Sequence, residues 1–402
     1  MLTRRFFIKG SAVVMAGTGA VPFWLGRAAA AAQGKRKTLV AIFQRGAADG
    51  LNIVAPFGDK RYTELRPTIG IAAPGKPNGA IDLDGTFGLH PQLEALKPLW
   101  EKRQLAIVEA TGSPDPSRSH FDAQDFMESG TPGVKGDGWL NRALLPPTPQ
   151  SSPLRAISMG AQLPRTLRGD RSAIAVADVQ QFRMDDYTAS IVENMYASSH
   201  DKQLEGAGKD AFAAMKMLQT LTRGPYTPAN NAQYAQAGEL GRSLQTIARL
   251  IKSDSGVEAA FAEVGGWDHH QNEPNQMANL LRQFGAALAA FSQDMGDRME
   301  DVVLVTMSEF GRTAAENGDS GTDHGHGSLM MVLGGPVQGG KVYGKWPGLE
   351  REQLFESRDL AVTTDFRAVL GELVSGHLAQ SDLAQVFPGF KPSEPLGLLK
   401  RT

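Results

Sequence analysis

The sequence contains no cysteine among its 402 residues, and this absence excludes several kinds of chemistry. A chain without thiols has no disulfide framework, no iron–sulfur cluster, no thiolate zinc site, no cysteine nucleophile and no formylglycine made from cysteine. An excess of positive charge is also missing, since 43 acidic side chains oppose 41 basic ones. The sequence therefore predicts no nucleic-acid partner, because contact with a phosphate backbone requires a basic patch. Asp, Glu, His, Ser and Arg must supply any chemistry.

Long apolar runs are missing too, and the first 32 residues have the layout of a secretory signal. They carry no acid, a short apolar stretch, small residues toward residue 32 and four basic residues: Arg4, Arg5, Lys9 and Arg27. The apolar stretch is too short for a stable membrane span. Residues 3–9, TRRFFIK, match a twin-arginine export signal. We therefore expect passage through the twin-arginine translocase, cleavage near Ala32 and a periplasmic or extracellular location.

Removal of this signal changes the charge of the chain. Four of the 41 basic residues are lost and none of the 43 acidic ones, so the mature chain carries 37 − 43, or −6, at neutral pH. The remainder, residues 33–402, is predicted to form a single α/β domain, because its composition is that of an ordinary globular protein.

Short apolar runs and helical patterns alternate along this domain. Buried strands are predicted at residues 38–43, 105–109, 154–159, 257–264, 302–307 and 329–333. Apolar residues spaced by three or four predict helices at 277–295, 90–100 and 358–373. Such alternation favours a doubly wound, mostly parallel sheet with helices on both faces. The region at about 180–255, rich in Ala, Gln and Met, is interpreted as a helical insertion or cap.

Polar loops at the ends of the predicted strands hold the residues with chemical potential. In a parallel sheet, functional groups gather in the loops that follow the strands. The polar loops here cover residues 45–52, 113–122, 265–272 and 308–327. Most of the histidines lie at or near predicted strand ends or helix starts: His90, His120, His269, His270, His324 and His326.

Imidazole and carboxylate groups without thiolates are ligands for zinc, manganese or iron and, with more oxygen, for magnesium or calcium. The predicted metal ligands are Asp49, Asp268, His270, Glu309, Asp323, His324 and His326. In the alternative interpretation the histidines cap helices and tie loops together. Asp49, which precedes Gly50, suits a turn equally well, and Glu309 suits an ion pair with Arg312.

The polar loop at residues 113–122 contains the candidates for a hydroxyl nucleophile. Ser119 is the first candidate and Ser117 the next, with Arg118 or Arg45 holding an anionic group of a small substrate. Arg312 is a further candidate for stabilising the charge that develops during the reaction. Helix capping explains either serine equally well, because Ser119 or Asp122 precedes or begins a predicted helix.

Five motifs together resemble one family of proteins. They are RGAADGL at 45–51, SRSHFDAQDFMESG at 117–130, GWDHH at 266–270, SEFGR at 308–312 and GTDHG at 321–325. The set is similar to the twin-arginine-exported bacterial proteins of domain of unknown function family 1501, from about residue 36 to about 395. That family more distantly resembles the alkaline phosphatase and sulfatase superfamily. The resemblance implies a doubly wound α/β sheet whose loops hold two divalent metals beside a Ser, Thr or formylglycine nucleophile.

The correspondence with the superfamily is partial. It implies that Asp268 and His270 bind one metal and that His324 is the later histidine, which precedes a strand ending in Gly335-Pro336. Glu309-Phe310 stands where the superfamily has an Asp-His pair, so one histidine ligand is missing. Arg45-Gly46 replaces an Asp followed by Gly after the first strand, with Asp49 further on. No serine lies securely in the nucleophile position.

Two functions from different classes are compatible with these residues. The first is a metal-dependent hydrolase of phosphate or sulfate esters. The second is a binding or assembly protein that keeps an alkaline-phosphatase-like fold without turnover. A redox enzyme is disfavoured, because the glycine turn at 46–50 lacks the G-x-G-x-x-G dinucleotide pattern and no cysteine ligates a cluster. No nucleotide, haem or iron–sulfur cofactor is predicted.

Overall fold

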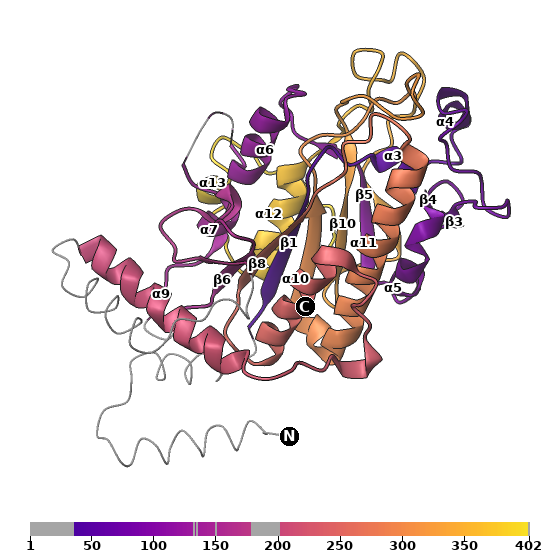
Figure 1. Ribbon diagram of the computed structural model, residues 1–402. Helices are drawn as coiled ribbons and strands as arrows, with labels where there is room; N and C mark the ends of the chain where they lie inside the picture. The colour runs from indigo at the N-terminus through magenta and orange to yellow at the C-terminus, as the bar shows by residue number, and fades with distance from the viewer. Residues whose placement is uncertain (1–35, 132, 134–135, 149–150, 178–201, 401–402) are drawn as a thin grey trace, which may run out of the picture.

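A nine-stranded sheet forms the centre of the molecule (Figure 1). The computed structural model describes residues 36–131, 133, 136–148, 151–177 and 202–400; the predicted export signal lies outside them. The strands of the sheet follow the order β11-β5-β10-β9-β1-β8-β6-β7, with β12 beside β5. Their bounds are β1 (Thr38–Gln44), β5 (Leu105–Gly112), β6 (Ala156–Met159), β7 (Ile174–Val176), β8 (Ala259–Val264), β9 (Val302–Met307), β10 (Ser328–Gly334), β11 (Lys341–Tyr343) and β12 (Thr364–Asp365).

The predicted mostly parallel sheet is confirmed, and each of the six predicted strands is present. β1 pairs in parallel with both β8 and β9. The sequence did not predict that β10 runs antiparallel to β9 and β5. The loop at 308–327 explains this direction: it contains no crossover helix, so the chain re-enters the sheet at the edge it had just left.

Helices cover both faces of the sheet, which gives three layers (Figure 1). One face carries η1 (Pro91–Leu96), α5 (Lys97–Glu101), α10 (Gly238–Lys252) and α11 (Glu273–Met295). The other carries α6 (His120–Ser129), α7 (Trp139–Ala143), α12 (Phe366–His377) and α13 (Leu383–Val386). Alternate side chains of β1 enter the two layers, with Val40 and Ile42 on the first face and Leu39 and Phe43 on the second.

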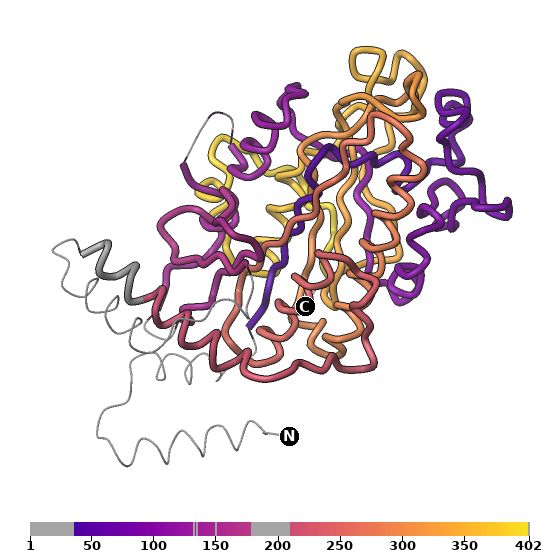
Figure 2. The backbone as a smooth tube through the Cα atoms, in the orientation of Figure 1, coloured from indigo at the N-terminus to yellow at the C-terminus, as the bar shows by residue number. Residues whose placement is uncertain are grey.

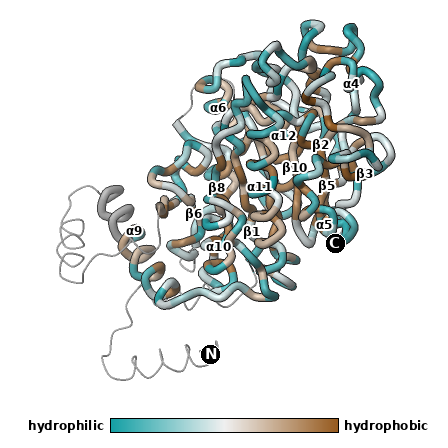
Figure 3. Tube along the Cα trace, turned by 45° about the vertical axis from the view of Figure 1, so that its right-hand side comes forward, coloured by the Kyte–Doolittle hydropathy of each residue, from teal (hydrophilic) through white to brown (hydrophobic). Residues whose placement is uncertain are grey.

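The remaining elements are short or peripheral. A small antiparallel sheet consists of β2 (Val54–Ala55), β4 (Gly88–Leu89) and β3 (Ile81–Asp82). The other helices are α3 (Gly50–Ile53), α4 (Lys60–Leu65), η2 (Arg165–Leu167), α9 (Lys202–Leu221), η3 (Ala229–Asn231) and η4 (Gly296–Asp301). No helix among the described residues has the length and apolar character needed to cross a membrane. Figure 3 shows hydrophobic residues along the central strands and hydrophilic residues on the outer loops.

The predicted helices form with some changes of length. α11 buries the predicted apolar stripe, including Met277, Leu281 and Phe284, and each such side chain contributes about 1.5–3 kcal/mol on burial. The helix predicted at 90–100 is divided into η1 and α5, because Pro98 has no N–H with which to continue the helix. The helix predicted at 358–373 begins only at Phe366, where the Asp365 carboxylate accepts from the Arg367 N–H as a cap.

The predicted helical region at 180–255 is described only in part. Residues 178–201 lie outside the described part of the chain, and the rest forms α9, η3 and α10. α10 packs against α11 and β8 and contributes Leu244 and Ile247 to the core beneath the sheet. At least this part of the region therefore covers the sheet directly.

Two buried histidines give the fold a predicted pH dependence. Burial lowers the pKa of His90 and of His377 from 6.5 to about 4, and the His377 Nε2–H donates to the Thr38 carbonyl at 3.0 Å. Below about pH 6.5 the unfolded chain binds protons that the folded chain excludes until about pH 4. The free energy of unfolding should thus fall across this window by about 3 kcal/mol for each group. His377→Gln should weaken this dependence in thermal unfolding measured between pH 7.5 and 4.5; an unchanged dependence would contradict the assignment.

Candidate metal centre

The polar loops meet at one edge of the central sheet (Figures 1 and 2). β1, β8 and β9 run parallel, so the loops that follow them leave the sheet at the same edge. β10 is antiparallel to both β9 and β5, which brings the loop before β10 and the loop after β5 to this edge as well. The structure thus confirms the expectation that strand order gathers these loops.

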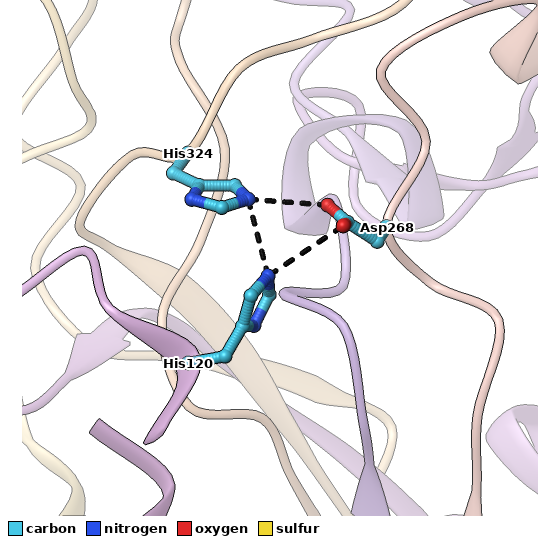
Figure 4. Close-up of side chains that lie close together, drawn as sticks. All are labelled: His120, Asp268 and His324. Carbon is cyan, nitrogen blue, oxygen red and sulfur yellow. Dashed lines mark hydrogen bonds and ion pairs between the residues drawn. The ribbon is translucent and has the colours of Figure 1, made fainter. Parts of the chain in front are cut away.

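Three side chains from three of these loops converge on one point (Figure 4). His120 is the first residue of α6, Asp268 follows β8, and His324 precedes β10. His120 Nε2 lies 3.1 Å from His324 Nε2, and the Asp268 oxygens lie 3.6 Å from His120 Nε2 and 3.2 Å from His324 Nε2. The three ligand atoms lie within 4.8 Å of one another. All three side chains are partly accessible, with exposed fractions of 25%, 45% and 26%.

His270 joins this cluster from the side of the β8 loop. Its Nε2 lies 3.0 Å from His324 Nε2 and 3.1 Å from the Asp268 Oδ1. We call the side chains of His120, Asp268, His270 and His324 the histidine cluster. It brings together three of the predicted ligands and one histidine, His120, that was placed at a strand end but not among the ligands.

Carboxylates on the outer side of the cluster fix two of the rings. His120 Nδ1 lies 2.7 Å from Glu309 Oε1, and His270 Nδ1 lies 3.2 Å from Asp323 Oδ1. An ionised carboxylate only accepts hydrogen bonds, so each Nδ1 carries the proton. Hydrogen bonds to Asp323 outweigh the effect of burial and lower its pKa, so that it is ionised.

The third ring is fixed by the backbone. His324 Nδ1 lies 3.1 Å from the Arg118 carbonyl oxygen, which also only accepts. In its neutral form, each of the three imidazoles presents an unprotonated Nε2 to the centre of the cluster. Lone pairs that face one another at 3.0 and 3.1 Å repel unless a proton or a metal ion lies between them.

The donor set fits a divalent metal. For a tetrahedral site with bonds of about 2.0–2.1 Å, ligand atoms lie about 3.3 Å apart. His120, Asp268 and His324 are 3.1–3.6 Å apart, and His270 lies 3.0 Å from His324 and 3.1 Å from Asp268. Neutral imidazole with carboxylate suits zinc, manganese or iron more than magnesium or calcium, which prefer oxygen ligands. Each ring is also held by an acceptor at its far nitrogen, as is usual for metal-binding histidines.

Arg312 holds the carboxylate of the cluster in place. Its guanidinium is buried and donates to Asp268 Oδ1 at 2.7 Å and to the Trp267 carbonyl at 3.3 Å. Burial alone would raise the pKa of Asp268, but Arg312, His270 and His324 outweigh it and lower that pKa. Asp268 is therefore ionised. Arg312 contacts Asp268 and not Glu309, the partner that the alternative interpretation of the sequence had given it.

Glu309 lies behind the cluster. Its Oε1 accepts from His120, from the Gly46 N–H at 2.9 Å and from the Gln124 amide at 2.9 Å, and its Oε2 accepts from Ser308. The residue is 1% exposed. Glu309 thus reaches the centre of the cluster only through the ring of His120.

Phe310 occupies the sequence position at which the superfamily resemblance had left a histidine missing. Its ring is buried and packs against His120 and His324, with centroids 5.0 and 5.1 Å apart. The residue supports two of the rings as an apolar wall. His120, from a different loop, supplies a third imidazole to the cluster.

Asp49 is not brought to the cluster. Its two oxygens accept from the Arg66 guanidinium at 2.5 and 3.0 Å, and both side chains are buried. Nearby, Glu273 accepts from Asn52 at 2.7 Å and from the Thr322 hydroxyl at 2.8 Å. Burial raises the pKa of Glu273 well above its usual range, whereas Arg66 outweighs burial and lowers that of Asp49.

His326 and the Arg118 side chain also point elsewhere. The His326 ring stacks on Phe355 at 4.3 Å between centroids. The Arg118 guanidinium donates to Asp359 at 2.5 Å and to Glu356 at 2.6 Å. Arg118 therefore joins the 355–359 loop to the cluster, because its own carbonyl holds His324.

Both serine candidates lie at the start of α6. Ser119 is its N-cap residue, but its side chain makes no capping hydrogen bond. The Ser119 N–H donates to Ser117 Oγ at 3.2 Å. Ser119 directly precedes His120, so its hydroxyl belongs to the loop that carries a ring of the cluster.

The role of Asp323 gives a prediction that can be measured on metal binding alone. Asp323→Ala removes the acceptor of His270 Nδ1 from an exposed position, and we expect the Kd for zinc to rise about tenfold or more. Asp319→Ala, an exposed change in the same loop, is the control and should leave the Kd unchanged. Equal affinities of the two variants would show that the hydrogen bond between His270 and Asp323 does not support metal binding.

Comparison with known proteins places the chain in a family and gives distant structural similarities. Residues 36–380 match the family described as "Protein of unknown function (DUF1501)", and no curated protein matches the sequence. Among solved structures, the chain is similar to a Vibrio parahaemolyticus protein in the alkaline phosphatase superfamily, with 10% identity, a TM-score of 0.35 and coverage of 81% of this chain and 71% of that one. It is also similar to the PsFucS1 sulfatase from Pseudoalteromonas sp., with 11% identity, a TM-score of 0.37 and coverage of 95% of this chain and 78% of that one. A third similar structure is the alkaline phosphatase of the Antarctic bacterium TAB5, with 12% identity, a TM-score of 0.29 and coverage of 76% of this chain and 93% of that one.

Proposed function

Because the chain belongs to the DUF1501 family of proteins of unknown function, we propose its function from the site itself: a divalent-metal centre that hydrolyses phosphate or sulfate esters. One observation carries the proposal. The imidazoles of His120 and His324 and the carboxylate of Asp268 converge at a partly exposed point, the ring of His270 adjoins them, and an acceptor holds the far nitrogen of every ring.

A divalent metal at this point would act as a Lewis acid toward an ester oxygen and would activate a nucleophile at neutral pH. The side chains of the protein have separate tasks. Asp268 and the three rings bind and orient the metal. Arg312 keeps Asp268 ionised and fixed, and Glu309 and Asp323 fix the protons on the far nitrogens. No carboxylate of this set needs to exchange a proton for the site to work.

The charge near the cluster supports a single metal. The guanidinium groups of Arg66 and Arg312 already neutralise Asp49 and contact Asp268, and Glu309 is saturated with donors. The described residues therefore offer one group of possible ligands, centred on His120, Asp268 and His324. This favours one-metal hydrolysis over the two-metal arrangement implied by the superfamily resemblance.

The attacking group in this proposal is the Ser119 hydroxyl or a water molecule. Ser119 supports the first choice because its side chain is not used as a cap and it adjoins His120. Replacement of Ser119 by Ala separates the two: loss of turnover with retained zinc assigns the attack to Ser119, whereas retained turnover assigns it to water.

The test is an assay of the purified chain, stripped of metal and then supplied with zinc, manganese or magnesium. Aryl phosphates, aryl sulfates and phosphodiesters are the substrates. The proposal predicts turnover that depends on the metal and disappears in Asp268→Asn. Metal binding without turnover of any ester would instead favour the binding or assembly function.

A further inference from the structure

An open groove along α11 reaches the β8 loop and has the chemistry of a binding site. Two hollows of about 510 and 520 Å³ lie along the outer side of α11. The first is bordered by Gly266 and His269 of the β8 loop, and the second reaches Met159 at the end of β6. Leu280 and Gln283 line both hollows, so the two are neighbours along α11, and we call them together the groove. The groove begins in the same loop that carries Asp268 and His270.

The polar lining of this groove is made of amides. Asn275, Gln276, Asn279 and Gln283 come from one helix and line the first hollow. Positions 275, 279 and 283 are spaced by four, which places them on one face of α11. Asn275 and Gln276 use their NH₂ groups within the protein and keep their oxygens available. The amides of Asn279 and Gln283 form no hydrogen bond with the described residues.

His269 supplies a second and independent feature at the end nearest the cluster. The residue is 2% exposed and lines the first hollow. Its Nδ1 is buried and has no hydrogen-bond partner among the described residues. A buried polar atom without a partner is rare in folded proteins and points to a water molecule or a ligand group that completes it.

The charge of the groove limits the class of ligand. No lysine or arginine belongs to the lining that the structure describes, and the acids there are Glu239 and Glu263. Glu263 already pairs with Arg45 at 2.6 Å. A polyanion has no partner in such a groove, so the part of the ligand that it holds carries no negative charge.

We propose that the groove binds the neutral, hydroxyl-rich chain of a carbohydrate whose ester group lies at the metal centre. The inference rests on the proposed function, since it names the class of the substrate of that centre. Each sugar hydroxyl both donates and accepts, and so does each amide of the lining. An extended peptide is recognised mainly by an open strand edge, whereas the backbone of α11 is already bonded within the helix.

The experiment screens the full-length, zinc-loaded chain against an array of neutral oligosaccharides and measures the best binder by calorimetry. A capped pentaalanine serves as the peptide probe. Asn279→Ala combined with Gln283→Ala should weaken oligosaccharide binding about tenfold or more, because two hydrogen bonds are lost. Gln245→Ala, the same kind of change on α10 outside the groove, should leave the affinity unchanged.

The outcomes separate the groove from the metal centre. Failure of every neutral oligosaccharide to bind, binding of pentaalanine alone, or an affinity unchanged in the double variant would overturn the proposed ligand class, while zinc content and ester turnover continue to report on the proposed function. Oligosaccharide binding that depends on Asn279 and Gln283 in a chain that holds no zinc would support the groove and overturn the metal-dependent function.

Discussion

Replacement of Asp268 by Asn should abolish stoichiometric metal binding by this protein. The Asp268 carboxylate is the one acid within the histidine cluster, and its Oδ1 lies 3.1 Å from His270 Nε2 and 3.2 Å from His324 Nε2. Loss of its charge removes the anionic ligand from three neutral imidazoles. Groups that merely orient metal ligands are typically worth 10–100-fold in affinity, so loss of this ligand should raise the Kd for zinc by more than about 100-fold.

The Asn side chain keeps an oxygen that accepts from Arg312, so the fold should be retained. Asp297→Asn is the matched control, since Asp297 is exposed in η4, next to the start of β9. Metal content after dialysis should be near one zinc per chain in the parent and in the control, and near zero in Asp268→Asn. Unchanged metal content in Asp268→Asn would place any metal outside the histidine cluster.

Replacement of Arg66 by Met should lower the free energy of unfolding more than any other substitution proposed for this protein. Its guanidinium is fully buried, pairs with both oxygens of Asp49 and donates to the carbonyls of Thr313 and Ala314 at 2.8 and 2.9 Å. Removal of one member of a buried ion pair leaves an uncompensated charge, which costs about 3–5 kcal/mol. The midpoint of thermal unfolding should fall by roughly 4–6 °C.

A control in α4 shows whether the loss of stability comes from burial of the ion pair or from the loss of any positive charge. Arg61 lies in α4 and its ion pair with Glu64 is solvent-exposed, so Arg61→Met should change the free energy of unfolding by less than about 1 kcal/mol. The chemistry of Asp49 is tested in the same series. Asp49→Asn should keep a full complement of zinc. Loss of zinc from this variant would show that Asp49 is a metal ligand, as the sequence had suggested.

The sheet could be predicted from the sequence because its strands are continuous apolar runs. Each run, such as 302–307, is buried on both faces. A strand that is buried on both faces has apolar residues at every position, and such a run can be recognised in the sequence. The direction of β10 could not be predicted in this way, since it depends on how the 308–327 loop crosses the sheet edge. The start of α12 was set by a cap at Asp365, which lies within the helical pattern and did not mark its limit.

The histidine cluster was predicted only where its members are close in sequence. Asp268 and His270 share a loop, and His324 belongs to a dense polar segment. His120 stands alone in sequence, and its place in the cluster follows from the position of β5 beside β10. The partner of Asp49 was also hidden, because Arg66 lies in a separate turn and contacts it only through tertiary packing.

The most direct measurement is the zinc K-edge X-ray absorption spectrum of the full-length chain loaded with one equivalent of zinc. The convergence of the histidine cluster predicts three imidazole nitrogens and one carboxylate oxygen at about 2.0–2.1 Å, with the multiple scattering that imidazole rings produce. A spectrum of oxygen ligands without imidazole scattering, or a chain that retains no zinc, would contradict a metal centre at this site.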